Sequence, residues 1–254
     1  MQIEYLNRLM AEVEARTGYS VIVVNDDKLQ SNVVMKTASS ELPNHIIMLN
    51  PEYERGANYL VAAQCLMLLM KQASEKEVCE FAVLDEKFEY LVGKALGQMT
   101  KINIPSDIRR PYAEQIVKGL LQQLNSMPCE IMGIRKIHRD APELRTEMEY
   151  VLNSVLAVNL EALSPEIRAS SPKDIFTKNA TMNAAFAIIC GDVLGNQGLV
   201  QPYKNIGLLD EGNKLADIIR NLSGPEETLY RKAVDSWAEH LKMRTMYKWT
   251  LREK

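Results

Sequence analysis

The chain has 254 residues, of which 46% are hydrophobic, and its formal net charge is -3. This amount of apolar material excludes a disordered or fibrous chain, because it suffices to bury a sizeable core in one large domain or two small ones. The near-neutral charge, with both signs interspersed, gives no strong nucleic-acid signal and no sign of binding to an anionic membrane.

The cysteines and the N-terminal segment indicate a cytoplasmic protein. Cys65, Cys79, Cys129 and Cys190 are widely spaced and form no C-x-x-C pair, which is typical of reduced, buried thiols rather than of a disulfide framework or a zinc ribbon. The opening segment carries several charges and lacks the apolar core of a signal peptide. The longest apolar run, around residues 59–70, is too short to cross a bilayer, so we expect no membrane segment.

The first fifty residues predict one helix followed by a small sheet. Apolar residues at helical spacing predict an amphipathic helix over residues 3–13, and Gly18 is a natural stop. The segments YSVIVVN, NVVMKTA and NHIIMLN are rich in valine and isoleucine and predict three strands. No segment between them is long enough for a crossover helix, so we expect an antiparallel or mixed sheet.

Beyond Pro51 the pattern is helical almost throughout. Prolines predict interruptions at NIPSDIRRP and NSMP, because proline breaks helices. The segment SPEIRASSPKD is the most linker-like, so we expect an α+β domain over residues 1–163 and a helical lobe over 164–254, packed on the first. The expected helices cover about residues 59–71, 75–98, 112–125, 129–139, 142–163, 179–195 and 208–222, and a last long helix follows SGPEE.

The fold class is therefore predicted to be α+β and mostly α. Grouping the strands near one end of the chain, with helices elsewhere, favours this class over an alternating α/β arrangement. The tail KMRTMYKWTLREK interleaves aromatic and basic residues, which predicts a terminal amphipathic helix docked on the core with its cations in solvent. The alternative for the tail is a stacking surface for nucleic acid or an anchor for a partner protein.

One strand-to-helix segment, HIIMLNPEYERGANYLVAAQCLMLLMK, suggests a function. Zinc hydrolases of the His-Glu-x-x-His type place two histidines four residues apart on one face of a helix that follows a strand, with a glutamate that activates water. The order of one helix, three strands and this segment resembles the ImmA/IrrE type of minimal zinc metallopeptidase. The resemblance covers about residues 1–163 and implies a zincin-like fold with residues 59–71 as the active-site helix.

The ligands that this resemblance implies are absent from the chain. Ala63 stands at the first histidine position, Gln64 at the glutamate and Met67 at the second histidine. Alanine has no donor atom, a methionine thioether is a poor zinc ligand, and glutamine cannot act as a base. Hydrolysis by the family's route would therefore lose both its metal and its proton acceptor, and we expect no zinc and no other cofactor.

A second segment, MPCEIMGIRKIHRDAPELR, resembles the part of the family that supplies an acidic residue near the metal. Glu130 keeps an acid there, but the later acidic position falls at about Ile134 or Arg135. The three histidines, His45, His138 and His240, have no Cys or His partner at metal-ligand spacing.

We therefore expect a non-catalytic, metallopeptidase-like protein that binds a protein or peptide, with no catalytic residues and no metal site. The candidate binding residues are Gln64, Glu130 and His138. One alternative is an enzyme whose site is relocated to those same residues. Another is a helical interaction protein unrelated to zincins, and the sequence leaves self-association open.

Overall fold

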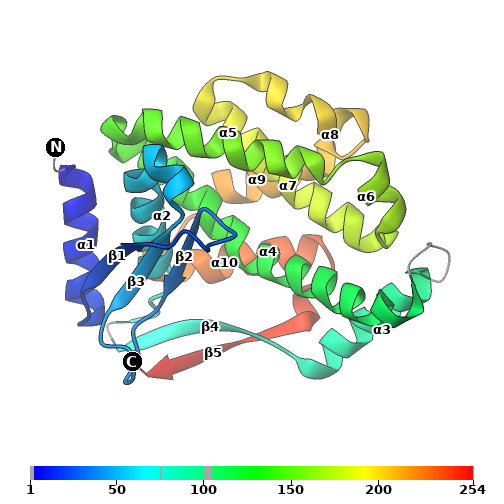
Figure 1. Ribbon diagram of the computed structural model, residues 1–254, viewed down its shortest axis with the longest axis horizontal. Helices are drawn as coiled ribbons and strands as arrows, with labels where there is room; N and C mark the ends of the chain where they lie inside the picture. Colours follow the sequence, from blue (N-terminus) through cyan, green and yellow to red (C-terminus); the bar gives the residue numbers. More distant parts are fainter. Residues whose placement is uncertain (1–2, 75, 100–104, 254) are drawn as a thin grey trace.

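The computed structural model describes residues 3–74, 76–99 and 105–253, and it confirms the predicted fold class. The chain is mostly helical, with an N-terminal helix, a small mixed sheet and a helical C-terminal region. In Figure 1 the three-stranded sheet lies beside the N-terminal helix, and the helices of the rest of the chain extend to the opposite end of the molecule.

The sheet follows helix α1 (Glu4–Thr17) and consists of strands β1 (Val21–Asn25), β2 (Val33–Lys36) and β3 (His45–Leu49). Its order is β1-β3-β2, with β1 parallel to β3 and β2 antiparallel to it. The strand spacing predicts an antiparallel or mixed sheet, and the mixed form is the one found. Side chains alternate between the faces of β3, so that His45, Ile47 and Leu49 are buried and anchor the sheet to the helices.

Helix α2 (Ala57–Met70) follows the 3-10 segment η1 (Pro51–Gly56) and packs against α1, β3, α4 (Ser106–Asp140), α5 (Arg145–Glu161) and α10 (Glu226–His240). A helix that is apolar on every side is expected to be enclosed in this way. From Tyr59 onward, only Ala63, Gln64 and Met67 keep part of their surface exposed. The three positions singled out by the sequence pattern therefore form the one open face of this half of the helix.

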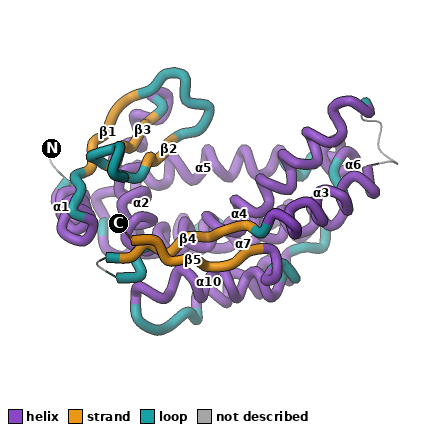
Figure 2. The backbone as a smooth tube through the Cα atoms, turned by 90° about the horizontal axis from the view of Figure 1, so that it is seen from below, coloured by secondary structure: helices purple, strands orange, loops and turns teal. Residues whose placement is uncertain are grey.

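A two-stranded ribbon corrects two predictions. Strand β4 (Glu77–Val83) pairs antiparallel with β5 (Tyr247–Glu253), and Figure 2 shows this ribbon apart from the three-stranded sheet. The prediction of a single helix over residues 75–98 is therefore wrong for residues 77–83, which form β4, while residue 75 lies outside the described residues. Helix α3 covers only Asp85–Met99. The docked terminal helix is also wrong, because the tail forms β5.

Aromatic packing explains why the tail is a strand. The ring of Phe81 on β4 stacks on that of Tyr247 with centroids 4.1 Å apart, and Trp249 meets both rings edge-on. Asp235 on α10 accepts hydrogen bonds from the Tyr247 hydroxyl at 2.6 Å and the Trp249 indole at 2.8 Å. These contacts come from segments far apart in the sequence, so local periodicity could not indicate them.

The predicted interruption at NSMP is wrong, because helix α4 continues through it. At NIPSDIRRP separate helices are confirmed, with α3 ending at Met99, but helix α4 begins at Ser106, earlier than the predicted residue 112. It runs for 35 residues through Pro111 and Pro128, although residues 103 and 104 of the first predicted break lie outside the described residues. Each proline removes one backbone donor. Burial outweighs that loss, because α4 contributes a long series of buried side chains and contacts α2, α3 and α10 along its length.

The C-terminal part adds further helices to the same core. They are η2 (Pro142–Leu144), α6 (Pro165–Ser170), α7 (Lys173–Leu194), η3 (Gln197–Val200), α8 (Gln201–Asn205), α9 (Leu209–Arg220) and η4 (Arg244–Met246). The segment predicted as a linker contains α6, which the Ser164 hydroxyl caps by accepting the Ile167 N–H at 3.4 Å. A single hydrophobic cluster joins buried residues on both sides of Leu163, and the domain boundary there stays a prediction.

Within the described ranges, no helix combines the length and the apolar character needed to cross a membrane.

Candidate functional site

The open face of α2 borders a cavity of about 260 Å³, which we call the α2 cavity. Ala63, Gln64 and Met67 line it together with Tyr59 and Leu60. Residues 60, 63, 64 and 67 recur at helical spacing, so they share one side of the helix. The three positions that the sequence pattern singled out thus face a cavity, in contrast to the closely packed remainder of the helix.

The other walls of the α2 cavity come from four elements. Glu130, on α4, is the acidic residue that the sequence pattern singled out, and it lies in the same cavity as Gln64. The start of β2 brings a polar edge through Asn32. The remaining lining residues are Val33 from β2, Cys129, Gly133 and Ile134 from α4, Val151, Leu152 and Val155 from α5, and Phe186 from α7. The cavity is therefore apolar along its walls, with polar groups from three separate elements.

The beginning of α2 is held by a side chain from another helix. The first turn of a helix leaves backbone N–H groups without intrahelical partners, and no side chain at the N-cap of α2 serves them. Glu147 of α5 accepts the Tyr59 N–H at 3.1 Å and the Asn58 amide at 2.7 Å. Its negative charge also suits the positive end of the helix. Glu147 thereby sets the position of α2 relative to α5, which are two walls of the cavity.

Close packing fixes the same junction. A Cβ at Gly56 would lie 2.2 Å from Cγ2 of Val151, so only glycine permits the approach of the two segments. Hydrogen bonds join Tyr53 to Ser154 and the Tyr150 hydroxyl to the Glu52 carbonyl, each at 3.3 Å. The η1 segment between β3 and α2 therefore contacts α5 near both of its ends.

The carboxyl group of Glu130 has a perturbed pKa. Burial in the cavity wall raises its pKa above the usual value, although a hydrogen bond with Ser126 and the charge of Lys71 act in the opposite direction. A shifted acid in a cavity is a common feature of functional sites. Its protonated form donates a hydrogen bond, whereas its ionised form attracts a cation.

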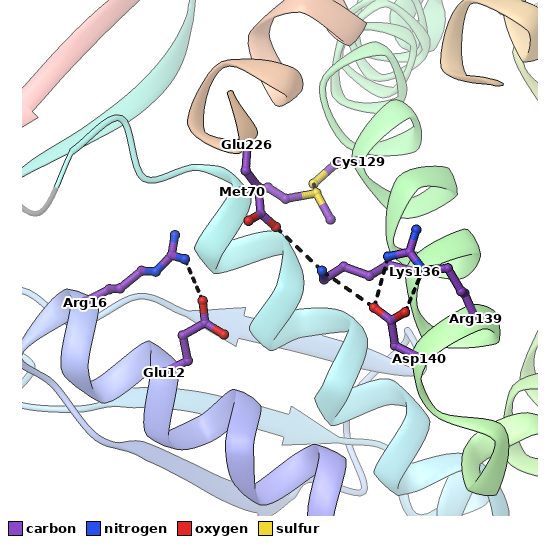
Figure 3. Close-up of polar contacts among 8 residues, drawn as sticks. All are labelled: Glu12, Arg16, Met70, Cys129, Lys136, Arg139, Asp140 and Glu226. Atoms are coloured by element: carbon purple, nitrogen blue, oxygen red, sulfur yellow. Dashed lines mark hydrogen bonds and ion pairs between the residues drawn. The ribbon is translucent and has the colours of Figure 1, made fainter. Parts of the chain in front are cut away.

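His138 does not join Gln64 and Glu130. It lines a separate cavity of about 840 Å³, whose walls come from α2, α4, α7, α9 and α10. In Figure 3, Lys136 lies between Asp140 and Glu226, at 3.7 Å from each, and Arg139 contacts Asp140 at 2.6 Å. His138 and Glu130 are eight residues apart on α4, about 12 Å along the helix axis. The predicted grouping of three residues is therefore reduced to two.

The other histidines have structural partners. His240 contacts Glu211 at 2.7 Å, and the buried His45 contacts Thr17 at 3.1 Å. Across the part of the chain that the structure describes, no three His, Cys, Asp or Glu side chains gather in a way that could hold a metal ion. The expectation of no metal site stays a prediction for the whole chain.

The α2 cavity includes residues that the sequence reasoning missed. Val33 begins β2 and Asn32 directly precedes it, about thirty residues before Gln64, and no local motif connects the two segments. The strand that the resemblance sets beside residues 59–71 is HIIMLN, so the resemblance gave no signal for Asn32 and Val33. The chain as a whole matches no family model, no curated protein and no solved structure.

Proposed function

We propose that the protein is a non-catalytic, metallopeptidase-like binding protein that holds an extended peptide beside α2, with one peptide side chain in the α2 cavity. The observation that carries this proposal is the lining of that cavity. In the resemblance, Ala63, Gln64 and Met67 stand at the positions of the zinc ligands and the base. These three residues line a cavity that they share with Glu130.

The edge of β2 supports the extended form of the ligand. β2 is an edge strand of the sheet, and no further strand among the described residues pairs with its outer side. Asn50 donates its N–H to the Asn32 carbonyl at 3.0 Å, so alternation along the ladder turns the backbone groups of Val33 and Met35 away from β3. These groups are the donors and acceptors that a peptide strand needs for pairing.

The chemistry of the α2 cavity specifies the side chain that enters it. Apolar walls from α5 and α7 accommodate an aliphatic stem, and Gln64 and Glu130 provide acceptors at its end. A lysine or arginine side chain combines such a stem with a cationic donor. Pairing with that cation favours the ionised form of Glu130 and thereby lowers its raised pKa.

Residue chemistry supports binding without cleavage. Neither Ala63 nor Gln64 provides a zinc ligand or a general base, and the Met67 thioether is too soft a donor to replace histidine. A bound peptide would therefore lie in the orientation of a substrate without an activated water beside it.

A displayed library of random peptides provides the test. Selection on the natural chain should enrich sequences with lysine or arginine at one position. Binding of these peptides should weaken at least about tenfold in Ala63→Phe, which fills the cavity. Val158→Phe is the matched control, since Val158 is 60% exposed on α5 and does not line the cavity. Equal binding by Ala63→Phe and the natural chain would refute the proposal.

The raised pKa of Glu130 favours one alternative, an enzyme that uses Glu130 and Gln64 as its site. Mass spectrometry of the selected peptides after incubation distinguishes the two functions. Intact peptides support the binding protein, whereas cleavage that Glu130→Gln abolishes would favour the enzyme. Stoichiometric zinc or iron in the purified protein would also contradict the non-catalytic proposal.

A further inference from the structure

Strand β1 forms the edge of the three-stranded sheet opposite to β2, and no strand within the described ranges pairs with its outer side. At the two ends of β1, the Ser20 carbonyl accepts a backbone hydrogen bond from β3 and the Asp26 N–H donates one to it, each at 2.9 Å. Backbone groups alternate in direction along a strand, so those of Val21, Val23 and Asn25 point outward, away from β3.

This edge lacks the features by which soluble proteins protect an edge strand. Such strands usually carry a charge, a proline or a bulge that hinders pairing with another chain. β1 reads VIVVN and contains neither a charged residue nor a proline, and its register with β3 runs without a bulge. The strand at the opposite edge, β2, carries Lys36. The edge of β1 is therefore the better template for a further strand.

Side chains of β1 are exposed on both faces of the sheet. Val23 is in register with the buried Ile47, so it lies on the face that the helices cover, whereas Ile22 and Val24 point to the outer face. Even so, Val23 is 39% exposed, and Ile22 and Val24 are 43% and 39% exposed. Contiguous apolar exposure of this kind marks interaction surfaces. Neither face of this edge is closed by the helices.

The outward-pointing residues of β1 are symmetric about Val23. In an antiparallel pair with the β1 strand of a second copy, Val23 can lie opposite its own counterpart, with Val21 opposite Asn25. Every outward N–H and C=O of both strands then has a partner, and Ile22 meets Val24 across the junction. A shift of the register by two residues would move Val21 or Asn25 past the end of the facing strand. The edge is therefore complementary to itself in one register.

Charge favours the antiparallel direction. Asp26 and Asp27 directly follow β1. In the antiparallel pair the two acidic ends are separated by the whole length of the ladder, and each lies near residues 18–20 of the other copy, which carry no charge. A parallel pair would place Asp26 beside its own counterpart, where like charges repel.

We propose that a second copy of this chain binds at the edge of β1, so that the sheets of the two copies join across a two-fold axis through Val23. Each copy contributes the same surface, which is the usual arrangement in symmetric dimers. A junction of five residues per strand is small beside the roughly 800 Å² per partner of a stable interface, so the dimer is weak and depends on concentration. The edge of β2 stays free for a peptide.

Sedimentation velocity of the natural chain, from about 1 µM to about 300 µM, provides the first test. We expect a reversible change from monomer to dimer, with no larger species. A monomer over the whole range would overturn the proposal. Growth into longer assemblies would also overturn it, because pairing of β1 with β2 of the next copy is a head-to-tail contact that does not close.

A pair of charged variants tests the register. Val23→Lys and Val23→Glu should each stay monomeric at about 300 µM, because two like charges would lie directly opposite each other at the axis. An equal mixture of the two variants should form a one-to-one dimer, with a dissociation constant at least about tenfold lower than that for self-association of either variant. Failure of the mixture to associate would overturn the proposal.

Control variants separate pairing at β1 from a general effect of substitution. Val23→Thr keeps the branched shape and the outward N–H, so it should dimerise as the natural chain does. Val34→Lys, at a 36% exposed position on the opposite edge strand, should do so too, and loss of the dimer in Val34→Lys would contradict the assignment to β1. Ala63→Phe should also dimerise normally, so the outcome is independent of peptide binding at the α2 cavity.

Discussion

The carboxylate of Glu147 on α5 accepts the backbone N–H of Tyr59, the third residue of α2, at 3.1 Å. Because the N-cap of α2 has no capping side chain, this contact between helices replaces a local one. Glu147→Ala should lower the free energy of unfolding by about 1–2 kcal/mol, measured by urea denaturation. Glu147→Gln keeps an acceptor and should retain most of the stability, and equal loss in both variants would contradict the capping role.

Gly56 and Val151 should show strong coupling. A Cβ added at Gly56 meets Cγ2 of Val151 at 2.2 Å, so Gly56→Ala should cost about 1–3 kcal/mol through overpacking. Shortening the neighbour in Gly56→Ala/Val151→Ala should make the double variant more stable than the two separate losses imply. Gly119→Ala is the control. No atom lies within 4 Å of the added Cβ in α4, so this change should stabilise the protein by about 0.5–1 kcal/mol.

Glu130 should make stability depend on pH. Its folded-state pKa is raised by burial above the ordinary value of 4.5. The folded state therefore binds the proton more tightly than the unfolded state does. The stability that the protonated Glu130 contributes is fully present below the ordinary pKa, and it is lost as the pH rises through the raised pKa. Glu130→Gln should match the natural chain in acid and exceed its stability at neutral pH, as measured by urea denaturation across a pH series. Parallel curves for the two proteins would exclude this role.

The four cysteines should be unreactive in the folded protein. Cys65, Cys79, Cys129 and Cys190 are buried, and burial raises the pKa of each thiol, to about 12 for Cys65 and Cys129 and about 11 for Cys79. The thiolate is the reactive form, so a neutral thiol reagent should label none of them at neutral pH. All should react once the chain is unfolded. Fast labelling of any cysteine under native conditions would contradict this burial.

Local patterns predicted the first helix, the three-stranded sheet and helix α2, because apolar periodicity and strand composition are properties of short segments. The β4–β5 ribbon was missed for a physical reason. Glu77 and Glu253 are paired at opposite ends of the sequence, and the stacking of Phe81 on Tyr247 exists only after folding. Pro128 led to a predicted helix break that does not exist, since tertiary packing keeps α4 helical around it.

The candidate site was predictable only in part. Ala63, Gln64 and Met67 are related by helical spacing, so their common face follows from the sequence. Glu130 came from a second segment whose resemblance to the family placed it near that face. His138, however, lines a different cavity from Gln64 and Glu130. The buried side chain of Gln72 gave no sequence signal at all, because the lack of a partner for its Oε1 among the described residues is visible only when its neighbours are placed.

The most direct test of the central claim uses the methyl group of Met67. Among the methionines that the structure describes, Met67 is the one that lines the α2 cavity, whereas Met132 lines the cavity that contains His138. NMR spectra of protein with methyl-¹³C methionine, assigned through Met67→Leu, report on both sites during titration with a selected lysine-containing peptide. We predict a saturable shift of the Met67 resonance, an unchanged Met132 resonance and an intact peptide. Saturable binding of that peptide with no change at Met67 would contradict the account.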